Sequence, residues 1–131
     1  MKITADTNVL VRAFLEDDPE QSKPAQAALR KAEIVALPIS TLCELVWVLR
    51  SYKIGTVDIA TTIRNLINGA NIVVNQPAAR AGLAMLDAGG DFADGVIAYE
   101  GNWLGADTFV SFDKRAVKLL EAQGKSARLL G

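Results

Sequence analysis

Short apolar runs alternate with helical patterns along the chain, and this alternation constrains the fold more than any other feature. Apolar residues in the longer segments recur three and four positions apart, as in Leu42, Leu45 and Val46, which is the period of an amphipathic helix. Strands that alternate with helices form a parallel sheet covered on both faces. The sequence therefore predicts an α/β/α sandwich whose central, mainly parallel sheet has about five short strands flanked by helices. The runs predicted as strands are Lys2 to Ala5, Ile34 to Leu37, Ile72 to Val74, Thr108 to Ser111 and Ala127 to Leu130.

The length and hydropathy of the chain set its domain count and compartment. A chain of 131 residues is typical of one domain, so we expect a single domain over residues 1–131. Charged residues interrupt every apolar run well before the roughly 18 residues that a membrane span needs. The first residues enter a predicted strand directly, without the apolar segment of a signal peptide. We therefore expect a cytoplasmic protein with no membrane contact.

Several catalytic mechanisms are excluded by the residues that the chain lacks. It contains no histidine, which removes the imidazole base, the Ser-His-Asp triad and the histidine metal site. Its one cysteine excludes an internal disulfide and a structural zinc cluster. Neither G-x-x-x-x-G-K-[ST] nor G-x-G-x-x-G occurs, so the glycine loops that bind nucleotide phosphates are missing. Carboxylates remain as the side chains able to carry chemistry.

Four carboxylates stand where predicted strands meet helices. Asp6 and Asp113 follow strands, Glu44 lies one turn into the helix after the second strand, and Asp94 begins the helix before the fourth strand. The carboxyl ends of parallel strands share one edge of a sheet, where ligands bind. Four negative groups at that edge would repel one another unless a cation neutralises them. An all-oxygen site of this kind favours Mg²⁺ or Mn²⁺.

Helix capping is the competing interpretation of each carboxylate. Asp6 and Asp113 could accept backbone N–H bonds at the start of the helices that follow them. Thr41-x-x-Glu44 matches a capping box, and Asp91 could cap the helix that contains Asp94. Four unrelated caps need not lie at one edge of a sheet beside polar neighbours, so the set as a whole favours a metal site.

The residues around these acids resemble the motifs of PIN-domain proteins of the VapC toxin type, the ribonucleases of type II toxin–antitoxin pairs. The resemblance runs in order over essentially the whole chain. Two departures, Ser111 in place of the usual Thr and Gly95 where Ala is common, leave the predicted metal site intact. The matching segments are Asp6-Thr7-Asn8-Val9-Leu10-Val11-Arg12, the helix acid Glu44, Asp91-Phe92-Ala93-Asp94-Gly95-Val96-Ile97-Ala98, and Thr108-Phe109-Val110-Ser111-Phe112-Asp113.

The resemblance implies an Mg²⁺- or Mn²⁺-dependent endoribonuclease that hydrolyses RNA phosphodiester bonds and is held inactive by a cognate antitoxin. Asp6, Asp94 and Asp113 would bind the metal, with Glu44 as a further ligand or as the base that orients water. The expected products carry a 5′-phosphate and a 3′-hydroxyl. Asp91 is either a fifth acid of the site or a helix cap. Three neutral groups are suited to orient the carboxylates and metal waters by hydrogen bonds: Thr7, Asn8 and Ser111.

The charge of the chain is compatible with an RNA substrate. The net charge is −1, and setting the four site acids aside leaves +3 for the remainder. Basic residues near the predicted site are candidate phosphate contacts, although each could equally belong to a solvated helix face: Lys114, Arg115, Lys118 and Arg12. The apolar helices between Gln21 and Lys53 predict a homodimer interface. Trp47 and Trp103 are expected in the core or in an interface.

Other functional classes fit less well. A receiver domain needs a phospho-acceptor Asp after its third strand, where this chain has Asn75-Gln76-Pro77. A haloacid-dehalogenase-type phosphatase needs Asp-x-Asp after the first strand, and this chain has Asp6-Thr7-Asn8. The stronger alternative is a catalytically silent PIN-fold module that binds RNA or protein without cutting.

Overall fold

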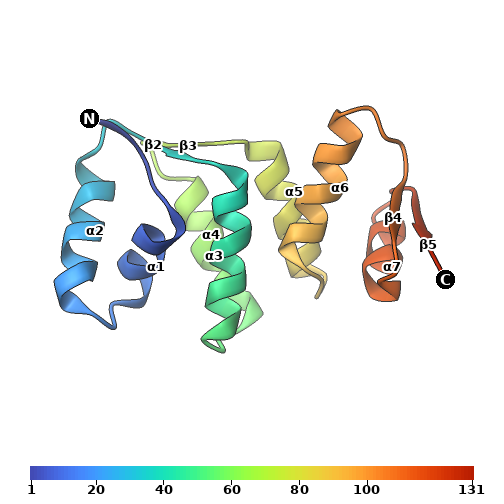
Figure 1. The fold of residues 1–131 in the computed structure, drawn as a ribbon, viewed down its shortest axis with the longest axis horizontal. Helices are drawn as coiled ribbons and strands as arrows, with labels where there is room; N and C mark the ends of the chain where they lie inside the picture. The colour runs from blue at the N-terminus through green and yellow to red at the C-terminus, as the bar shows by residue number, and fades with distance from the viewer. The chain divides into compact units, whose positions relative to one another are not determined.

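Seven helices and five strands follow one another in a computed structural model that describes residues 1–131 (Figure 1). The chain divides into two units, Met1–Asn75 and Gln76–Gly131, and each is described by itself. None of the helices is long and apolar enough to cross a membrane. The first unit contains β1 (Lys2–Thr4), α1 (Thr7–Leu15), α2 (Pro19–Lys31), β2 (Ile34–Leu37), α3 (Ile39–Ser51), α4 (Thr56–Ile67) and β3 (Ile72–Val74). The second contains α5 (Gln76–Asp87), α6 (Phe92–Trp103), β4 (Phe109–Ser111), α7 (Lys114–Ala122) and β5 (Ala127–Leu129).

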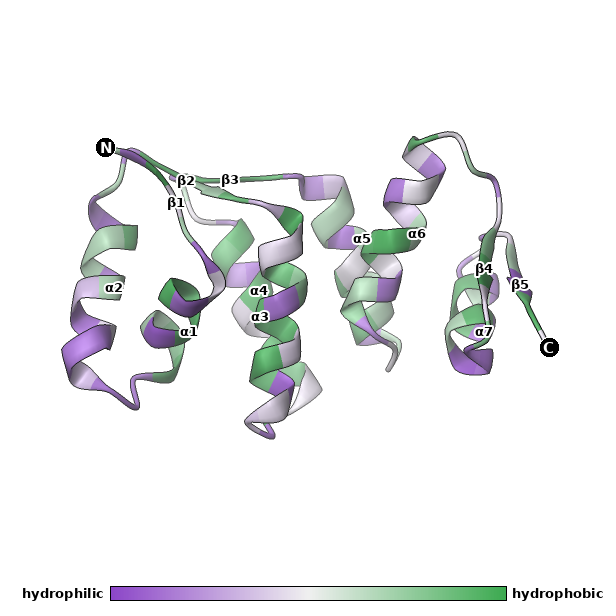
Figure 2. Ribbon diagram, in the orientation of Figure 1, coloured by the Kyte–Doolittle hydropathy of each residue, from purple (hydrophilic) through white to green (hydrophobic).

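The first unit is built on a parallel sheet with strand order β1-β2-β3. Lys2 pairs with Ile34, and Val35 pairs with Ile72. β2 is the central strand and the most buried of the three, and Figure 2 shows β2 and β3 largely in the green of hydrophobic residues. Because all three strands run in the same direction, the chain leaves β1 and β2 at the same end of the sheet, where α1 and α3 begin.

Apolar stripes of the helices fill the core of the first unit. The stripe of α3 predicted from its spacing is buried, and α3 packs against α1 and α4. Each fully buried Leu or Ile contributes about 1.5–3 kcal/mol relative to an exposed one. The side chains that are buried completely in this unit are Leu10, Val35, Leu42, Leu45, Ile59 and Ile63.

The second unit combines a helix pair with a β-α-β element. α5 and α6 pack against each other and are joined by a short turn that contains Gly89 and Gly90. Strands β4 and β5 are parallel, with Phe109 opposite Ala127, and α7 connects them and packs on both. Met85, Leu86, Phe92 and Leu120 are buried almost completely and form the centre of this unit.

The predicted α/β class with parallel strands is confirmed, and β2 and β3 have the predicted bounds. The five strands pair as a set of three and a set of two. Of the two locations predicted for the tryptophans, the core is wrong, because Trp47 is 72% exposed and Trp103 is 76% exposed. Trp47 lies between Val46 and Val48 but outside the buried stripe of α3, since successive helical residues point about 100° apart.

Candidate carboxylate site

Asp6 and Glu44 lie at the same end of the sheet in the first unit. Asp6 is the N-cap of α1, and its Oδ1 accepts a hydrogen bond from the backbone N–H of Val9 at 3.0 Å. The Thr7 hydroxyl, in the first turn of α1, donates to Glu44 Oε2 at 2.8 Å. The packing of α1 against α3 therefore holds the Glu44 carboxylate next to the segment that carries Asp6. Asn8, the third polar residue of this segment, is exposed and makes no hydrogen bond to either carboxylate.

Three further acids lie in the second unit. Asp91 is the N-cap of α6 and accepts from the Ala93 N–H at 3.1 Å, while Asp94 stands in the first turn of that helix. Asp113 is the N-cap of α7 and accepts from the backbone N–H groups of Arg115 and Ala116 at 3.0 and 3.1 Å.

Ser111 fixes the segment that leads into α7. Its hydroxyl oxygen accepts a hydrogen bond from the backbone N–H of Asp113 at 2.9 Å. Ser111 is the last residue of β4, so this bond ties the end of the strand to the start of the helix. In this structure the Ser111 hydroxyl therefore contacts the backbone of Asp113 and not its carboxylate.

The pKa of Asp94 is shifted by its surroundings in the second unit. Partial burial raises the pKa of Asp94 above its ordinary value of 3.8, and the negative charges of Asp91 and Asp113 raise the pKa further. The carboxylates of Asp91 and Asp113 are therefore close enough to Asp94 to oppose its ionisation. A bound cation would reverse this effect, because it favours the ionised form of each carboxylate.

The capping and metal-binding interpretations turn out to be compatible. Asp6, Asp91 and Asp113 each use only Oδ1 to accept backbone N–H bonds. Their Oδ2 atoms make no hydrogen bond within the protein and keep their lone pairs for another partner. Each cap therefore fixes the carboxylate on a helix end while leaving one oxygen able to coordinate an ion.

The interpretation of Thr41 and Glu44 as a capping box is wrong. The helix α3 begins at Ile39, so Thr41 lies inside it and is buried, and the N-cap position is held by Pro38, which makes no side-chain cap bond. The helix therefore starts three residues earlier than the box requires. Glu44 is consequently free of a capping role, and its carboxylate is directed to Thr7 instead.

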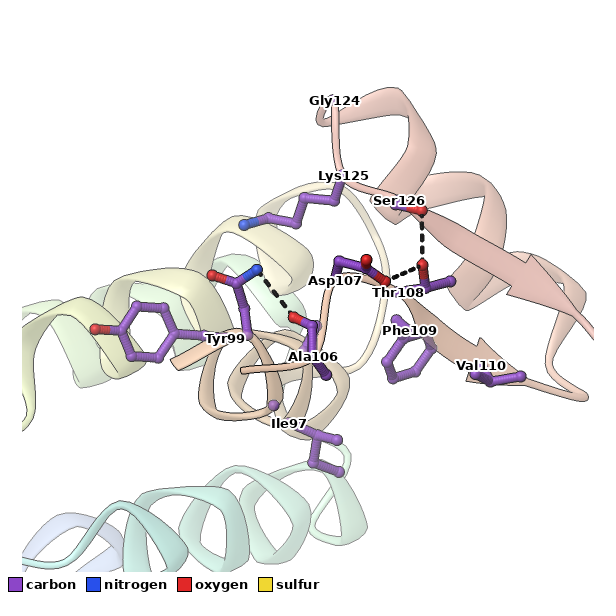
Figure 3. Close-up of a pocket in the computed structure, with 13 residues that line it drawn as sticks. Ile97, Tyr99, Ala106, Asp107, Thr108, Phe109, Val110, Gly124, Lys125 and Ser126 are labelled. Atoms are coloured by element: carbon purple, nitrogen blue, oxygen red, sulfur yellow. Dashed lines mark hydrogen bonds between the residues drawn. The ribbon is translucent and has the colours of Figure 1, made fainter. Parts of the chain in front are cut away.

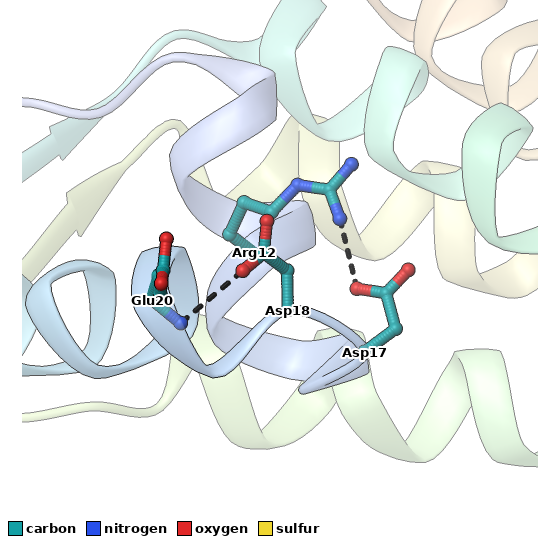
Figure 4. Close-up of polar contacts among 4 residues, drawn as sticks. All are labelled: Arg12, Asp17, Asp18 and Glu20. Atoms are coloured by element: carbon teal, nitrogen blue, oxygen red, sulfur yellow. Dashed lines mark hydrogen bonds and ion pairs between the residues drawn. The ribbon is translucent and has the colours of Figure 1, made fainter.

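The predicted RNA contacts differ in their surroundings. The Arg12 guanidinium forms an ion pair with Asp17 at 2.8 Å, which neutralises its charge locally; Figure 4 shows this pair beside the Asp18 cap of α2. Lys114, Arg115 and Lys118 are exposed on α7, directly after Asp113. Of the four basic candidates, the three on α7 therefore keep their charge available beside the acids.

A cavity in the second unit is lined by none of the five acids. It has a volume of about 500 Å³ and is formed by the end of α6 and the starts of β4 and β5. Thr108 donates to Asp107 at 2.9 Å and contacts the Ser126 hydroxyl at 3.1 Å on its wall (Figure 3). Asp113 follows the opposite end of β4. The cavity is thus separate from the carboxylates to which the sequence assigns the chemistry.

The sequence of the chain matches the family model of the PIN domain over residues 3–121. The chain belongs to the PIN-domain family. The match contains all five acids described above, nearly the whole of the first unit, and residues 76–121 of the second. PIN domains are generally nucleases that use divalent metal ions and act on RNA, so this membership indicates a nuclease-type hydrolase. No curated protein matches the sequence.

The acids of this PIN domain stand in two sets. Asp6 and Glu44 belong to the first unit, and Asp91, Asp94 and Asp113 to the second. Within neither unit do three of these side chains gather closely enough to hold a metal ion by themselves. Their chemistry nevertheless fits Mg²⁺ or Mn²⁺, because every donor is a carboxylate oxygen and at least one oxygen of each N-cap acid makes no other bond.

Proposed function

We propose that this PIN-domain protein is an Mg²⁺- or Mn²⁺-dependent endoribonuclease. The proposal rests on the hydrogen bonds of the capping acids. One carboxylate oxygen of each accepts backbone N–H bonds, and the other makes no hydrogen bond within the protein. In this proposal Asp6, Asp94 and Asp113 hold the metal, and Glu44 acts as a ligand or orients the attacking water.

The neighbouring groups of the chain have defined tasks in this proposal. Thr7 restricts the Glu44 carboxylate to one orientation through its 2.8 Å hydrogen bond. Ser111 holds the backbone from which the Asp113 side chain projects. When bound, a divalent cation supplies positive charge that stabilises the phosphoryl oxygens and makes water more acidic. The products are expected to carry a 5′-phosphate and a 3′-hydroxyl.

The substrate side of the proposal rests on charge. Lys114, Arg115 and Lys118 follow Asp113 on the exposed face of α7, so they can contact phosphates of the RNA backbone. Arg12 is a weaker candidate because Asp17 already occupies its guanidinium.

The motif resemblance supports a more specific biological role. We propose that the protein is the toxin of a VapBC-type pair, acts in the cytoplasm as a homodimer, and is inhibited by a cognate antitoxin. An anionic pocket is blocked most directly by an Arg or Lys that pairs with its carboxylates. The antitoxin is therefore expected to carry a basic residue in its toxin-binding segment.

Cleavage of RNA in the presence and absence of metal tests the proposed activity. Purified protein should cut RNA with Mg²⁺ or Mn²⁺ and lose this activity in excess chelator. The double variant Asp6→Asn/Asp94→Asn, purified in the same way, is the matched control for a contaminating ribonuclease. Activity that survives both chelator and the double substitution contradicts the mechanism. Binding of RNA without cleavage by folded protein supports the silent-module alternative.

A further inference from the structure

Gly95, the residue after Asp94, is a point of close approach between α6 and α5. A Cβ atom added to Gly95 would clash with the carbonyl oxygen of Ala81 and would lie 2.9 Å from Cγ of Met85. Protein Cβ atoms essentially never come closer than 3.0 Å to such atoms, so any side chain at this position would require α6 and α5 to shift apart. The obstacle is a backbone carbonyl, which cannot rotate away as a side chain can.

A second close contact lies on the other side of Asp94. Phe92, which is fully buried, packs over Gly82 of α5, where an added Cβ would lie 2.6 Å from the Phe92 ring. Phe92 and Gly95 therefore bracket Asp94 in the sequence, and both touch α5. The position of the Asp94 carboxylate is consequently set by the distance between these two helices.

The same surface of α5 also locates Asp113. The turn after α5 packs against α7, since a Cβ on Gly90 would lie 2.7 Å from Leu119 Cδ1 and 3.1 Å from Met85 Cε. Gln123, just after α7, contacts the sulfur of Met85 at 3.6 Å. Met85 thus lies against α6 and against the α7 segment at once, and it is completely buried.

We propose that Gly95 is a positioning residue for the carboxylate site, because its missing side chain allows α6 to approach α5 and so places Asp94 relative to Asp91 and Asp113. The inference rests on the proposed function, since it assumes that Asp94 and Asp113 bind the same ion. Gly95 touches neither metal nor RNA, and its effect passes through the position of the helix.

The variants Gly95→Ala and Gly101→Ala form a matched pair for the test. Both residues lie in α6, and both substitutions favour the helix, but an added Cβ at Gly101 meets no atom within 4 Å. Mn²⁺ affinity is measured without RNA, by electron paramagnetic resonance of free Mn²⁺, at a temperature where circular dichroism shows each protein to be folded. Rates of RNA cleavage are measured separately at saturating metal.

Gly95→Ala is expected to weaken Mn²⁺ binding by about 10- to 100-fold, the scale of losing a group that orients ligands. At saturating metal its kcat should fall by up to about 10²-fold, the scale of a 1 Å misplacement, with KM for RNA nearly unchanged. Gly101→Ala should keep the wild-type Mn²⁺ affinity and kcat. A loss of Mn²⁺ affinity that occurs in folded Gly95→Ala but not in Gly101→Ala would support the positioning role. A purely structural role would not change ligand geometry in a folded protein.

Wild-type Mn²⁺ affinity in folded Gly95→Ala would overturn the inference and leave the proposed function standing. Failure of the wild-type protein itself to bind Mn²⁺ would overturn both. If Gly95→Ala does not fold, Met85→Leu provides the second test, because it conserves volume but removes the sulfur that reaches Gln123. Unchanged Mn²⁺ affinity in folded Met85→Leu would then overturn the inference, and a loss of about tenfold would support it.

Discussion

Asp113 allows the capping and metal-binding roles to be measured separately in one side chain. Its Oδ1 accepts two backbone N–H bonds at the start of α7, so Asp113→Ala removes the whole cap. Loss of such a cap costs about 0.5–2 kcal/mol, and two lost bonds favour the upper end of this range. Asp113→Asn keeps an oxygen that can accept both bonds, while it loses the negative charge.

The expected stability of Asp113→Asn is close to that of the wild type. The lost charge removes about 0.3–1 kcal/mol of favourable interaction with the helix dipole. Relief of repulsion with Asp94, whose pKa Asp113 helps to raise, acts in the opposite direction. Both variants should nevertheless lose about 10²-fold or more of cleavage activity, which corresponds to about 2.7 kcal/mol of transition-state stabilisation.

Urea unfolding followed by circular dichroism measures the stability of each variant, and single-turnover cleavage of a labelled RNA at saturating Mg²⁺ measures its activity. Asp113→Ala should lower the urea midpoint by about 1 M, whereas Asp113→Asn should leave it nearly unchanged. The reasoning is refuted if Asp113→Asn cleaves RNA at the wild-type rate. It is refuted equally if activity in the two variants falls only in proportion to their stability.

Two further predictions concern the charge of the site and the biological role. The pKa of Asp94 is raised in the folded state, so the folded protein binds the carboxyl proton of Asp94 more tightly than the unfolded chain does. The contribution of this proton to the free energy of unfolding is therefore present at low pH and is lost as pH rises through the folded pKa. The urea unfolding midpoint of metal-free Asp94→Asn should therefore match that of the wild type below about pH 3.8 and exceed it at pH 7. Equal midpoints at pH 7 would contradict the raised pKa, which partial burial and the charges of Asp91 and Asp113 cause. Expression of the wild-type protein without its antitoxin should arrest growth of the host cell, and co-expression of the antitoxin should restore it. Expression of Asp6→Asn should be tolerated. Harmless overexpression of soluble, folded wild-type protein would favour a silent binding module.

The sequence predicted the fold class because strands and helices have different periods of apolar residues. Those periods located β2 and β3 at their observed bounds and identified the buried stripe of α3. The same local signals identified Asp6, Asp91 and Asp113 at helix starts, since residue preferences at a helix N-terminus act over three or four residues. The Thr41 box was wrong because Pro38 starts its helix earlier, which is a local competition between two start signals.

Tertiary packing decided what the local pattern could not contain. The hydrogen bond from Thr7 to Glu44 joins residues 37 positions apart, and no periodicity encodes such a pair. Gly95 looked like a neutral departure from the family motif, yet it faces the Ala81 carbonyl across the α5–α6 contact. The sequence determines which elements form and which side chains begin them, because those choices depend on nearby residues. The distances between helices, and with them the placement of Asp94, depend on how side chains from distant segments fill a shared core.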